Sequence, residues 1–152
     1  MDSDHQGRRD HGQVTAPPLR TDRHTLQIEG FRHSNPIPAA CRKGPLLMSG
    51  LIIGTDPGSG ALGETLEAQC AYMFIHIRRI LAAGGGDIGD LVRLTVWLKD
   101  RTQREPLNAQ WLAMFPDEHA RPARIALHAP DLAGGILVQC EITAYIDNPL
   151  PA

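Results

Sequence analysis

The sequence predicts a single α+β domain in which two helices pack on one face of a mixed sheet. Its length of 152 residues lies within the ~100–200 residues of one typical domain. Hydrophobic residues make up 42% of the chain and charged residues 21%, a balance that suits a packed core rather than a wholly disordered chain. Segments with strand-like and helix-like apolar spacing follow one another in the order β-β-α-β-α-β-β, which favours helices layered on a sheet.

A disordered polar tail is expected over residues 1–24, followed by one folded domain over residues 25–148. The tail contains almost no bulky apolar side chain, and its four arginines and four aspartates cancel in charge. The histidines of the tail are irregularly spaced, so we expect solvated side chains rather than metal ligands at His5, His11 and His24.

Two strands are expected before the first helix. Residues 24–31 hold several bulky apolar side chains and predict the first strand, and prolines interrupt residues 35–40. Residues 45–53 form a nearly continuous apolar run that is too short for a good helix, which predicts a central strand. Residues 54–63 are expected to form a loop, because a proline there fixes φ and several glycines accept positive φ.

The apolar spacing becomes helical from Glu64. Apolar side chains three or four residues apart predict one buried helix face, formed by Leu66, Cys70, Met73, Ile77 and Leu81. The polar residues of the same segment are expected on other faces of the helix, namely Glu67, Gln69, His76 and Arg79. Three consecutive glycines, residues 84–86, predict a C-terminal cap rather than a phosphate-binding loop, which would have to precede a helix.

A strand, a helix and two further strands are expected in the second half of the domain. Residues 91–99 are β-branched and alternating, and residues 105–115 predict a helix that tolerates Pro106 in its first turn. Residues 123–129 and 136–146 predict the last two strands. Two helices cannot cover both faces of the sheet, so we expect self-association to bury the other face.

The composition argues against nucleic acid, membranes and metals as partners. A net charge of −2 and a pI near 6.4 provide no general attraction to a phosphate backbone. No apolar run approaches the ~20 residues that span a bilayer, and the polar N-terminus does not resemble a signal peptide, so a cytoplasmic protein is expected. Cys41, Cys70 and Cys140 stand far apart, as expected for buried reduced thiols. The sequence lacks phosphate-loop, nucleophile-elbow and zinc motifs, and no cofactor is expected.

The segment Arg121-Pro122-Ala123-Arg124 enters a predicted strand and supplies a candidate anion-binding group. A proline-stiffened turn beside a strand can hold Arg124 still, and a fixed guanidinium matches a carboxylate with two parallel hydrogen bonds. From the residues alone, a surface ion pair of Arg124 with Asp117 or Glu118 is an open alternative.

Several motifs, in their order and spacing, resemble those of the RidA/YjgF/L-PSP family over roughly residues 33–146. The combination of a strand motif ending in Leu98-Lys99-Asp100 with a later Arg-Pro-Ala-Arg makes the set fairly specific. The matching segments are residues 35–40 (NPIPAA), 47–50 (LMSG), 56–60 (DPGSG), 67–84, 90–100 (DLVRLTVWLKD), Asn108, 121–124 (RPAR) and 138–144.

This resemblance implies a homotrimer with the chorismate-mutase-like fold, a barrel-like assembly whose three clefts lie between neighbouring subunits. RidA-type members hydrolyse reactive enamines and imines, such as 2-aminoacrylate and 2-iminopropanoate, to a 2-oxo acid and ammonia without a cofactor. Arg124 matches the arginine that binds the substrate carboxylate in those members. Ser49 matches a serine that lines the cleft, and Asn108 matches an asparagine early in the second helix. A backbone-bonded serine and an exposed helix residue are the respective alternatives.

The sequence departs from the family at the position of the water-activating group. Where deaminating members carry a glutamate on the last strand, this chain has Gln139, which can orient a water but cannot act as a general base. Glu141 lies on the same face of that strand and is either a substitute or a structural carboxylate. His128 is expected on the same side of its strand as Arg124, as a proton donor or acceptor or as a packed or surface histidine.

The expected function is hydrolytic deamination of a reactive enamine or imine, with Arg124 binding the substrate carboxylate. Residues 41–44 stand where many family members have a loop whose tyrosine borders the cleft, so a bulkier, 2-aminomuconate-type substrate is also expected. The alternative is a non-catalytic trimer that binds a small carboxylate and has lost the water-activating glutamate. Ribonuclease activity or translation inhibition, attached to relatives by name, is disfavoured by the acidic balance and by the lack of interleaved basic and aromatic residues.

Overall fold

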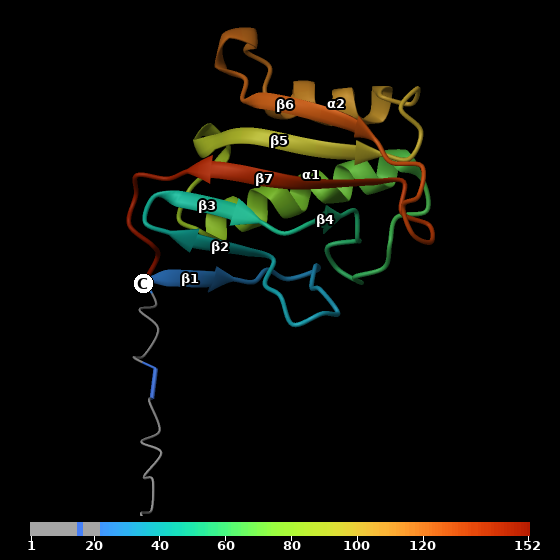
Figure 1. Ribbon diagram of the computed structural model, residues 1–152. Helices are drawn as coiled ribbons and strands as arrows, with labels where there is room; N and C mark the ends of the chain where they lie inside the picture. Colours follow the sequence, from blue (N-terminus) through green and yellow to red (C-terminus); the bar gives the residue numbers. More distant parts are fainter. Residues whose placement is uncertain (1–14, 17–21) are drawn as a thin grey trace, which may run out of the picture.

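A mixed sheet of seven strands forms the centre of the computed structural model, which describes residues 15–16 and 22–152 (Figure 1). The strands neighbour one another in the order β1-β2-β3-β7-β5-β6, and the short β4 pairs with β7 beyond the end of β3. Strand β6 runs parallel to β5, and the other described pairs are antiparallel. The strands are β1 (Arg23–Leu26), β2 (Ala40–Lys43), β3 (Leu46–Ser49), β4 (Ile52–Ile53), β5 (Leu91–Leu98), β6 (Ala123–His128) and β7 (Val138–Tyr145).

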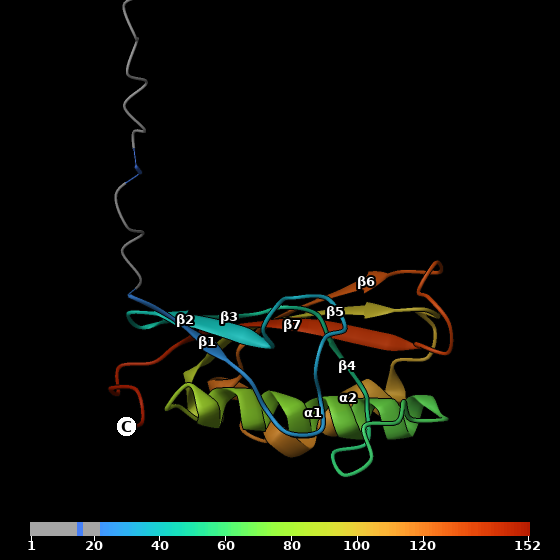
Figure 2. The ribbon, with the colours of Figure 1, turned by 90° about the horizontal axis from the view of Figure 1, so that it is seen from below.

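Two α-helices, α1 (Leu66–Ala83) and α2 (Glu105–Met114), lie on one face of the sheet (Figure 2). Short 3-10 turns lead from α1 into β5, at Ile88–Asp90, and from α2 into β6, at Glu118–Ala120. This arrangement confirms the predicted α+β class, with a mixed sheet and both helices on one side. Most of the predicted tail lies outside the described residues, and β1 begins inside its last two positions.

Helix α1 has a side-chain cap at its amino end and the predicted glycine cap at its carboxyl end. The hydroxyl of Thr65 accepts a hydrogen bond from the amide of Ala68 at 3.1 Å, which satisfies one of the free amides of the first turn. Gly84 ends the helix, and Gly85 adopts a φ of +82°, which is strained for any residue with a Cβ. The predicted glycine cap is therefore confirmed.

The predicted single strand over residues 45–53 is wrong. The chain leaves β7 after β3 and resumes pairing in β4, and the register changes by one residue across this break. Met48 lies opposite Thr143, whereas Ile52 lies opposite Cys140. One extra residue on one side of an antiparallel pair is a bulge, which a continuous apolar run does not reveal.

Strand β2 occupies residues for which the sequence predicts no strand. Arg42 explains the difference, since its side chain is only 5% exposed although its charge argues for the surface. The guanidinium donates hydrogen bonds to four backbone carbonyls, those of Gly44, Gly84, Ile146 and Asn148. Arg42 therefore fastens the β2–β3 turn and the C-terminal segment to the carboxyl end of α1, where a positive charge is also favoured by the helix dipole.

Two polar residues of α1 that the sequence places on outer faces, Gln69 and His76, are fully buried, which corrects that prediction. The amide nitrogen of Gln69 donates to the carbonyls of Gly63 and Gly135 at 2.8 and 2.9 Å, and its oxygen accepts from the amide of Leu137 at 2.9 Å. Both donors and the oxygen of this amide are engaged, so Gln69 joins the loop before α1 to the segment that enters β7.

His76 lies against the backbone and hydroxyl of Thr55. Its Nε2 is 2.8 Å from the Thr55 carbonyl oxygen and 2.9 Å from Oγ1. Burial lowers the pKa of His76 below its ordinary value of 6.5, the hydrogen bond to Thr55 opposes this shift, and the charge of Arg79 adds to it. The imidazole is therefore neutral in the folded protein at neutral pH.

Acid is expected to destabilise the protein through His76. Below its ordinary pKa of 6.5 the imidazole of the unfolded chain takes up a proton, while the buried imidazole resists it. The contribution of His76 to the free energy of unfolding should thus be greatest above that pH. It should decrease as the pH falls towards the lower pKa of the folded state. Urea unfolding between about pH 5 and about pH 7.5 measures this slope. His76→Gln should flatten it, and His119→Gln, at a side chain 86% exposed, should not. Equal slopes for wild type and His76→Gln would contradict the assignment.

The cysteines differ in their surroundings. Cys70 and Cys140 are buried and free, as the sequence predicts, but Cys41 is half-exposed, so the prediction of a buried thiol is wrong there. Burial raises the pKa of the Cys70 thiol to about 12, with a further contribution from Glu67. Burial also raises the pKa of Cys140. Both buried thiols stay protonated and act as small apolar side chains.

The face of the sheet opposite the helices carries exposed apolar side chains. Leu46 and Met48 of β3 and Ile125 and Leu127 of β6 are each 42–48% exposed. Figure 2 shows both helices on the other side of the sheet. Exposed apolar side chains gathered on one face of a sheet are typical of an interaction site. We call this surface the open face.

Candidate functional site

Arg124 is held between strand β6 and helix α2. Its Nη2 donates a hydrogen bond to Oδ1 of Asn108 at 2.8 Å, and its guanidinium carbon lies 5.1 Å from the centroid of the Trp111 ring. Trp111 is buried and meets Phe115 edge to face, with ring centroids 4.9 Å apart. Asn108 and Trp111 face the arginine together because they stand three residues apart on α2. A hydrogen bond and an aromatic face thus fix the guanidinium.

No described carboxylate forms an ion pair with Arg124, since none lies within 4 Å of its guanidinium. The surface pair with Asp117 or Glu118 that the sequence allows is therefore not formed. The Nη1 atom is buried and makes no hydrogen bond. Burial lowers the pKa of Arg124, and the positive charge of Arg104 lowers it further. A partly buried cation without a counter-ion favours an anionic ligand.

A hollow of about 500 Å³ opens at the amino end of α2. Its volume is in the range of small-molecule sites. Asn108 lines this hollow and also accepts the hydrogen bond of Arg124, so the guanidinium, which is not itself part of the lining, is linked to the hollow through Asn108. The lining residues are Glu67, Thr102, Gln103, Arg104, Glu105, Pro106 and Asn108.

Ser49 supports the sheet. Its hydroxyl oxygen accepts a hydrogen bond from the amide of Ile142 at 2.8 Å, at the point where β3 leaves β7. The backbone-bonded serine, one of the two alternatives from the sequence, is therefore present. Strands β7 and β5 lie between Ser49 on β3 and Arg124 on β6. At ~4.8 Å between neighbouring strands, the two residues of one chain are about 14 Å apart.

Gln139 and Glu141 lie on the opposite side of the sheet from Arg124. On β7 they alternate with residues buried beneath the helices, and Trp97 lies directly opposite Gln139. Arg124 instead pairs with the buried Leu94 of β5 and so points to the helix side. One chain therefore does not gather these three polar side chains around a single ligand.

His128 occupies the side of β6 that carries Arg124, because it pairs with the buried Leu98. It is exposed, and four residues of extended chain separate the two side chains by about 13 Å. The carboxylate of Asp100 lies nearby. Hydrogen bonds from the hydroxyl and amide of Thr102 lower the pKa of Asp100, and the charge of His128 lowers it further.

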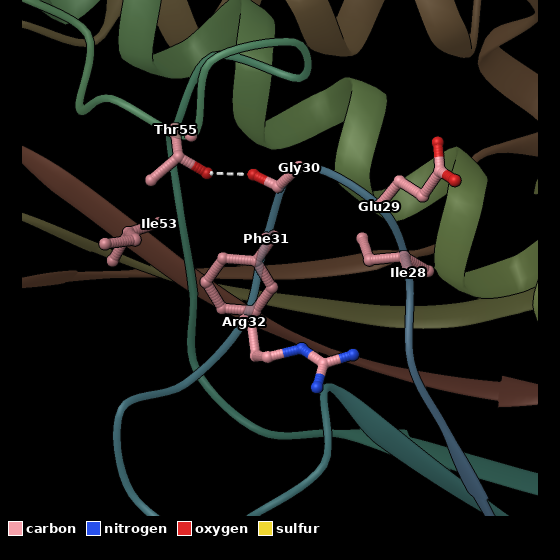
Figure 3. Close-up of a pocket in the computed structure, with 8 residues that line it drawn as sticks. Ile28, Glu29, Gly30, Phe31, Arg32, Ile53 and Thr55 are labelled. Carbon is pink, nitrogen blue, oxygen red and sulfur yellow. Dashed lines mark hydrogen bonds between the residues drawn. The ribbon is translucent and has the colours of Figure 1, made fainter.

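A separate pocket of about 470 Å³ lies between β4 and the segment that follows β1 (Figure 3). The hydroxyl of Thr55 donates to the carbonyl of Gly30 at 2.8 Å across this pocket, and the same oxygen contacts the buried His76. The Thr55 hydroxyl and the Gly30 carbonyl are thus engaged in structural hydrogen bonds. None of the site residues predicted from the sequence lines this pocket.

Two neighbours of Arg124 are not among the site residues predicted from the sequence. The first is Trp111, which the apolar period assigns only to the core, although its spacing of three residues from Asn108 was an available signal. The second is Arg104, whose approach to Arg124 depends on how α2 packs beside β6 and has no signal in the sequence.

Two further findings concern metals and membranes. Within residues 15–16 and 22–152, no three or more His, Cys, Asp or Glu side chains gather in a way that could hold a metal ion. No helix in that part of the chain is both long and apolar enough to cross a membrane.

Sequence comparison identifies relatives over most of the chain. A family model described as Endoribonuclease L-PSP matches residues 35–146. The 2-iminobutanoate/2-iminopropanoate deaminase of Salmonella typhimurium is 29% identical over 102 residues, which cover 66% of this chain and 80% of that protein. A RutC family protein of Pyrococcus horikoshii is 28% identical over 111 residues, which cover 72% of this chain and 86% of that protein.

Solved structures share the fold. The RidA protein of the Antarctic bacterium Psychrobacter matches with a TM-score of 0.73 and 28% identity, over 81% of this chain and 99% of that chain. The YjgF gene product of Escherichia coli matches with a TM-score of 0.71 over 80% of this chain and 98% of that chain, and at 23% identity it supports the fold alone. Because the family model covers most of the chain, the protein belongs to the RidA/YjgF family, described in that model as Endoribonuclease L-PSP.

Proposed function

We propose that this protein hydrolyses a 2-imino acid to the corresponding 2-oxo acid and ammonia. The observation that carries the proposal is the guanidinium of Arg124, which is held by Asn108 and Trp111, partly buried and unpaired with any described carboxylate. A 2-imino acid supplies the missing anion through its own carboxylate. Relatives in Salmonella typhimurium and Escherichia coli are named 2-iminobutanoate/2-iminopropanoate deaminase, which supports the same reaction class.

The reacting site is proposed to lie between two copies of the chain. Arg124 stands at the edge strand β6 on the helix side, whereas Gln139 and Glu141 stand on the open face. A second copy whose open face meets that edge would bring both sets of groups into one cleft. The exposed apolar side chains of the open face, such as Met48 and Leu127, would be buried by such contacts. A homotrimer with three equivalent clefts meets this requirement.

The proposed chemistry needs one water and no cofactor. Arg124 fixes the carboxylate while a water oriented by Gln139 adds to the carbon of the C=N bond, and its proton passes to the imine nitrogen. The resulting carbinolamine loses ammonia and leaves a C=O bond. Glu141 and His128 are the candidate proton carriers, and Ser49 is assigned to support of the cleft wall, because its hydroxyl is bonded to a backbone amide. Much of the acceleration comes from holding the reactants in position.

Gln139→Glu is expected to raise kcat about tenfold with little change in KM, because a carboxylate can accept a proton from the attacking water and an amide cannot. Initial rates with 2-iminobutanoate at several concentrations measure both constants. Thr143→Glu is the matched control, since it adds the same charge two positions beyond Glu141 on the same face. A kcat of Gln139→Glu equal to that of wild type would contradict the proposed role of Gln139 in orienting the attacking water.

The direct test is turnover by the purified protein. An amino-acid oxidase can generate 2-iminobutanoate in place, and formation of 2-oxobutyrate is then followed with and without the protein. A rate above the uncatalysed rate supports the proposal. No turnover, together with a rise in Tm on adding 2-oxobutyrate, would instead identify a non-catalytic carboxylate-binding protein, the second candidate that the amide of Gln139 favours.

A bulkier enamine of the 2-aminomuconate type belongs to the same proposal. Residues 41–43 end strand β2 and place no tyrosine there. The cleft is therefore proposed to be wider than one bordered by a tyrosine. RNA cleavage, the activity in the family description, is not proposed, because a net charge of −2 offers little attraction to a phosphate backbone.

A further inference from the structure

A second positive centre lies beside the proposed carboxylate anchor. Arg104 immediately precedes α2, and after burial its charge is the next cause that lowers the pKa of Arg124. Its Nε donates a hydrogen bond to the carbonyl of Arg101 at 3.1 Å, which holds the side chain at the start of the helix. No carboxylate of the described residues lies within 4 Å of either Arg104 or Arg124.

The amino end of α2 adds to this positive field. No side chain caps the first turn of the ten-residue helix, so its free amides present partial positive charge, although Pro106 supplies no amide and Glu105 adds a carboxylate to the same turn. Arg104 and Asn108 line the hollow that opens at this end, and Asn108 also accepts a hydrogen bond from Arg124, whose own side chain does not line the hollow. Glu67 and Glu105 also line the hollow, and neither forms an ion pair with Arg104.

We infer that the substrate carries a second acidic group, which Arg104 and the amino end of α2 bind while Arg124 holds the 2-carboxylate. The inference rests on the proposed deaminase function and specifies its substrate class as imines of acidic amino acids, which are dicarboxylates. Arg104 then acts as a specificity-determining residue.

The charges of the site favour this class over the others. Two neighbouring guanidinium groups repel one another, and that repulsion is relieved when each is paired with an anion. A monocarboxylate pairs only one of them. A substrate with a cationic side chain would bring a third positive charge to Arg104 and Arg124. A dianionic substrate gives each of the two guanidinium groups a negative partner.

Binding of product-type acids tests the inference without requiring turnover. Isothermal titration calorimetry should give a Kd for 2-oxoglutarate at least about tenfold lower than the Kd for 2-oxobutyrate. Arg104→Gln should abolish this preference by weakening 2-oxoglutarate about tenfold, while the Kd for 2-oxobutyrate changes less than about twofold. Arg124→Gln should weaken both acids. Arg101→Gln is the matched control, because it removes an exposed arginine three residues away and keeps the carbonyl that holds Arg104.

Three outcomes would overturn the inference: equal affinity of the wild type for the two acids, equal weakening of both acids by Arg104→Gln, or tighter binding of the 2-oxo acid derived from arginine. Tighter binding of the arginine-derived acid would indicate that Glu67 and Glu105 bind the side chain of the substrate. Turnover separates this inference from the proposed function. If the imines of glutamate and 2-aminobutyrate are hydrolysed with equal kcat/KM, the dicarboxylate preference is rejected and the proposed deaminase function is retained. If neither imine is hydrolysed, the proposed deaminase function is rejected. The binding preference for dicarboxylates is still measured independently by calorimetry.

Discussion

Substituting Arg124 with alanine is expected to lower kcat/KM for a 2-imino acid by about 100- to 1000-fold, equivalent to about 3–4 kcal/mol of transition-state stabilisation. The loss follows from the position of the guanidinium, which Asn108 and Trp111 hold in one orientation beside the hollow. Alanine removes both the charge and the planar pair of donors that a carboxylate requires. Steady-state rates with 2-iminobutanoate measure the effect.

Two further variants separate charge from geometry at this position. Arg124→Lys keeps the positive charge without the planar fork and should fall between wild type and alanine. Asn108→Ala frees the guanidinium to rotate and should raise KM with a smaller effect on kcat. Circular dichroism and Tm verify that each variant is folded. An alanine variant with wild-type kinetics and unchanged binding of 2-oxobutyrate would eliminate Arg124 as the carboxylate anchor.

Arg42→Met is expected to lower the free energy of unfolding by about 3 kcal/mol. Methionine fills much of the same space but leaves four buried or half-buried carbonyls without the donors that Arg42 supplies. Urea unfolding at one fixed protein concentration measures the change, since association of copies would add to the apparent stability.

Lys43→Met is the control for Arg42→Met. The side chain of Lys43 is 64% exposed and meets Asp22 at 3.6 Å, so its removal should cost less than about 1 kcal/mol. A loss of similar size for both substitutions would show that the hairpin, and not the bonds of the buried guanidinium, determines the effect.

The fold was largely predictable because the two helices and the last three strands carry regular apolar periods. The prediction failed where polar side chains are buried. No strand was predicted at β2, where the charged Arg42 is buried, and Gln69 and His76 were predicted outside the apolar stripe of α1 in which they are buried. Their burial depends on carbonyls and amides contributed by distant segments, which no local pattern specifies.

The candidate site was predictable residue by residue but not as an arrangement. Alternation along one strand relates Arg124 to His128 and Gln139 to Glu141, yet it does not relate β6 to β7. The apolar Ile125 and Leu127 suggest that their side of β6 faces the core, whereas they are exposed on the open face and Arg124 points to the helices. Only the pairing of β5 with both strands determines this.

The hydroxyl of Ser49 replaces a backbone carbonyl as hydrogen-bond acceptor at the point where β3 separates from β7. This role affects how substitutions at Ser49 must be interpreted. Alanine would leave the Ile142 amide without its acceptor. A lower rate of the alanine variant would therefore be explained equally well by damage to the sheet and by loss of a ligand contact. Threonine keeps the oxygen and adds only a methyl group. Comparing the alanine and threonine variants would separate the structural role of Ser49 from a role in ligand binding. The family pattern alone suggests only the ligand-binding role.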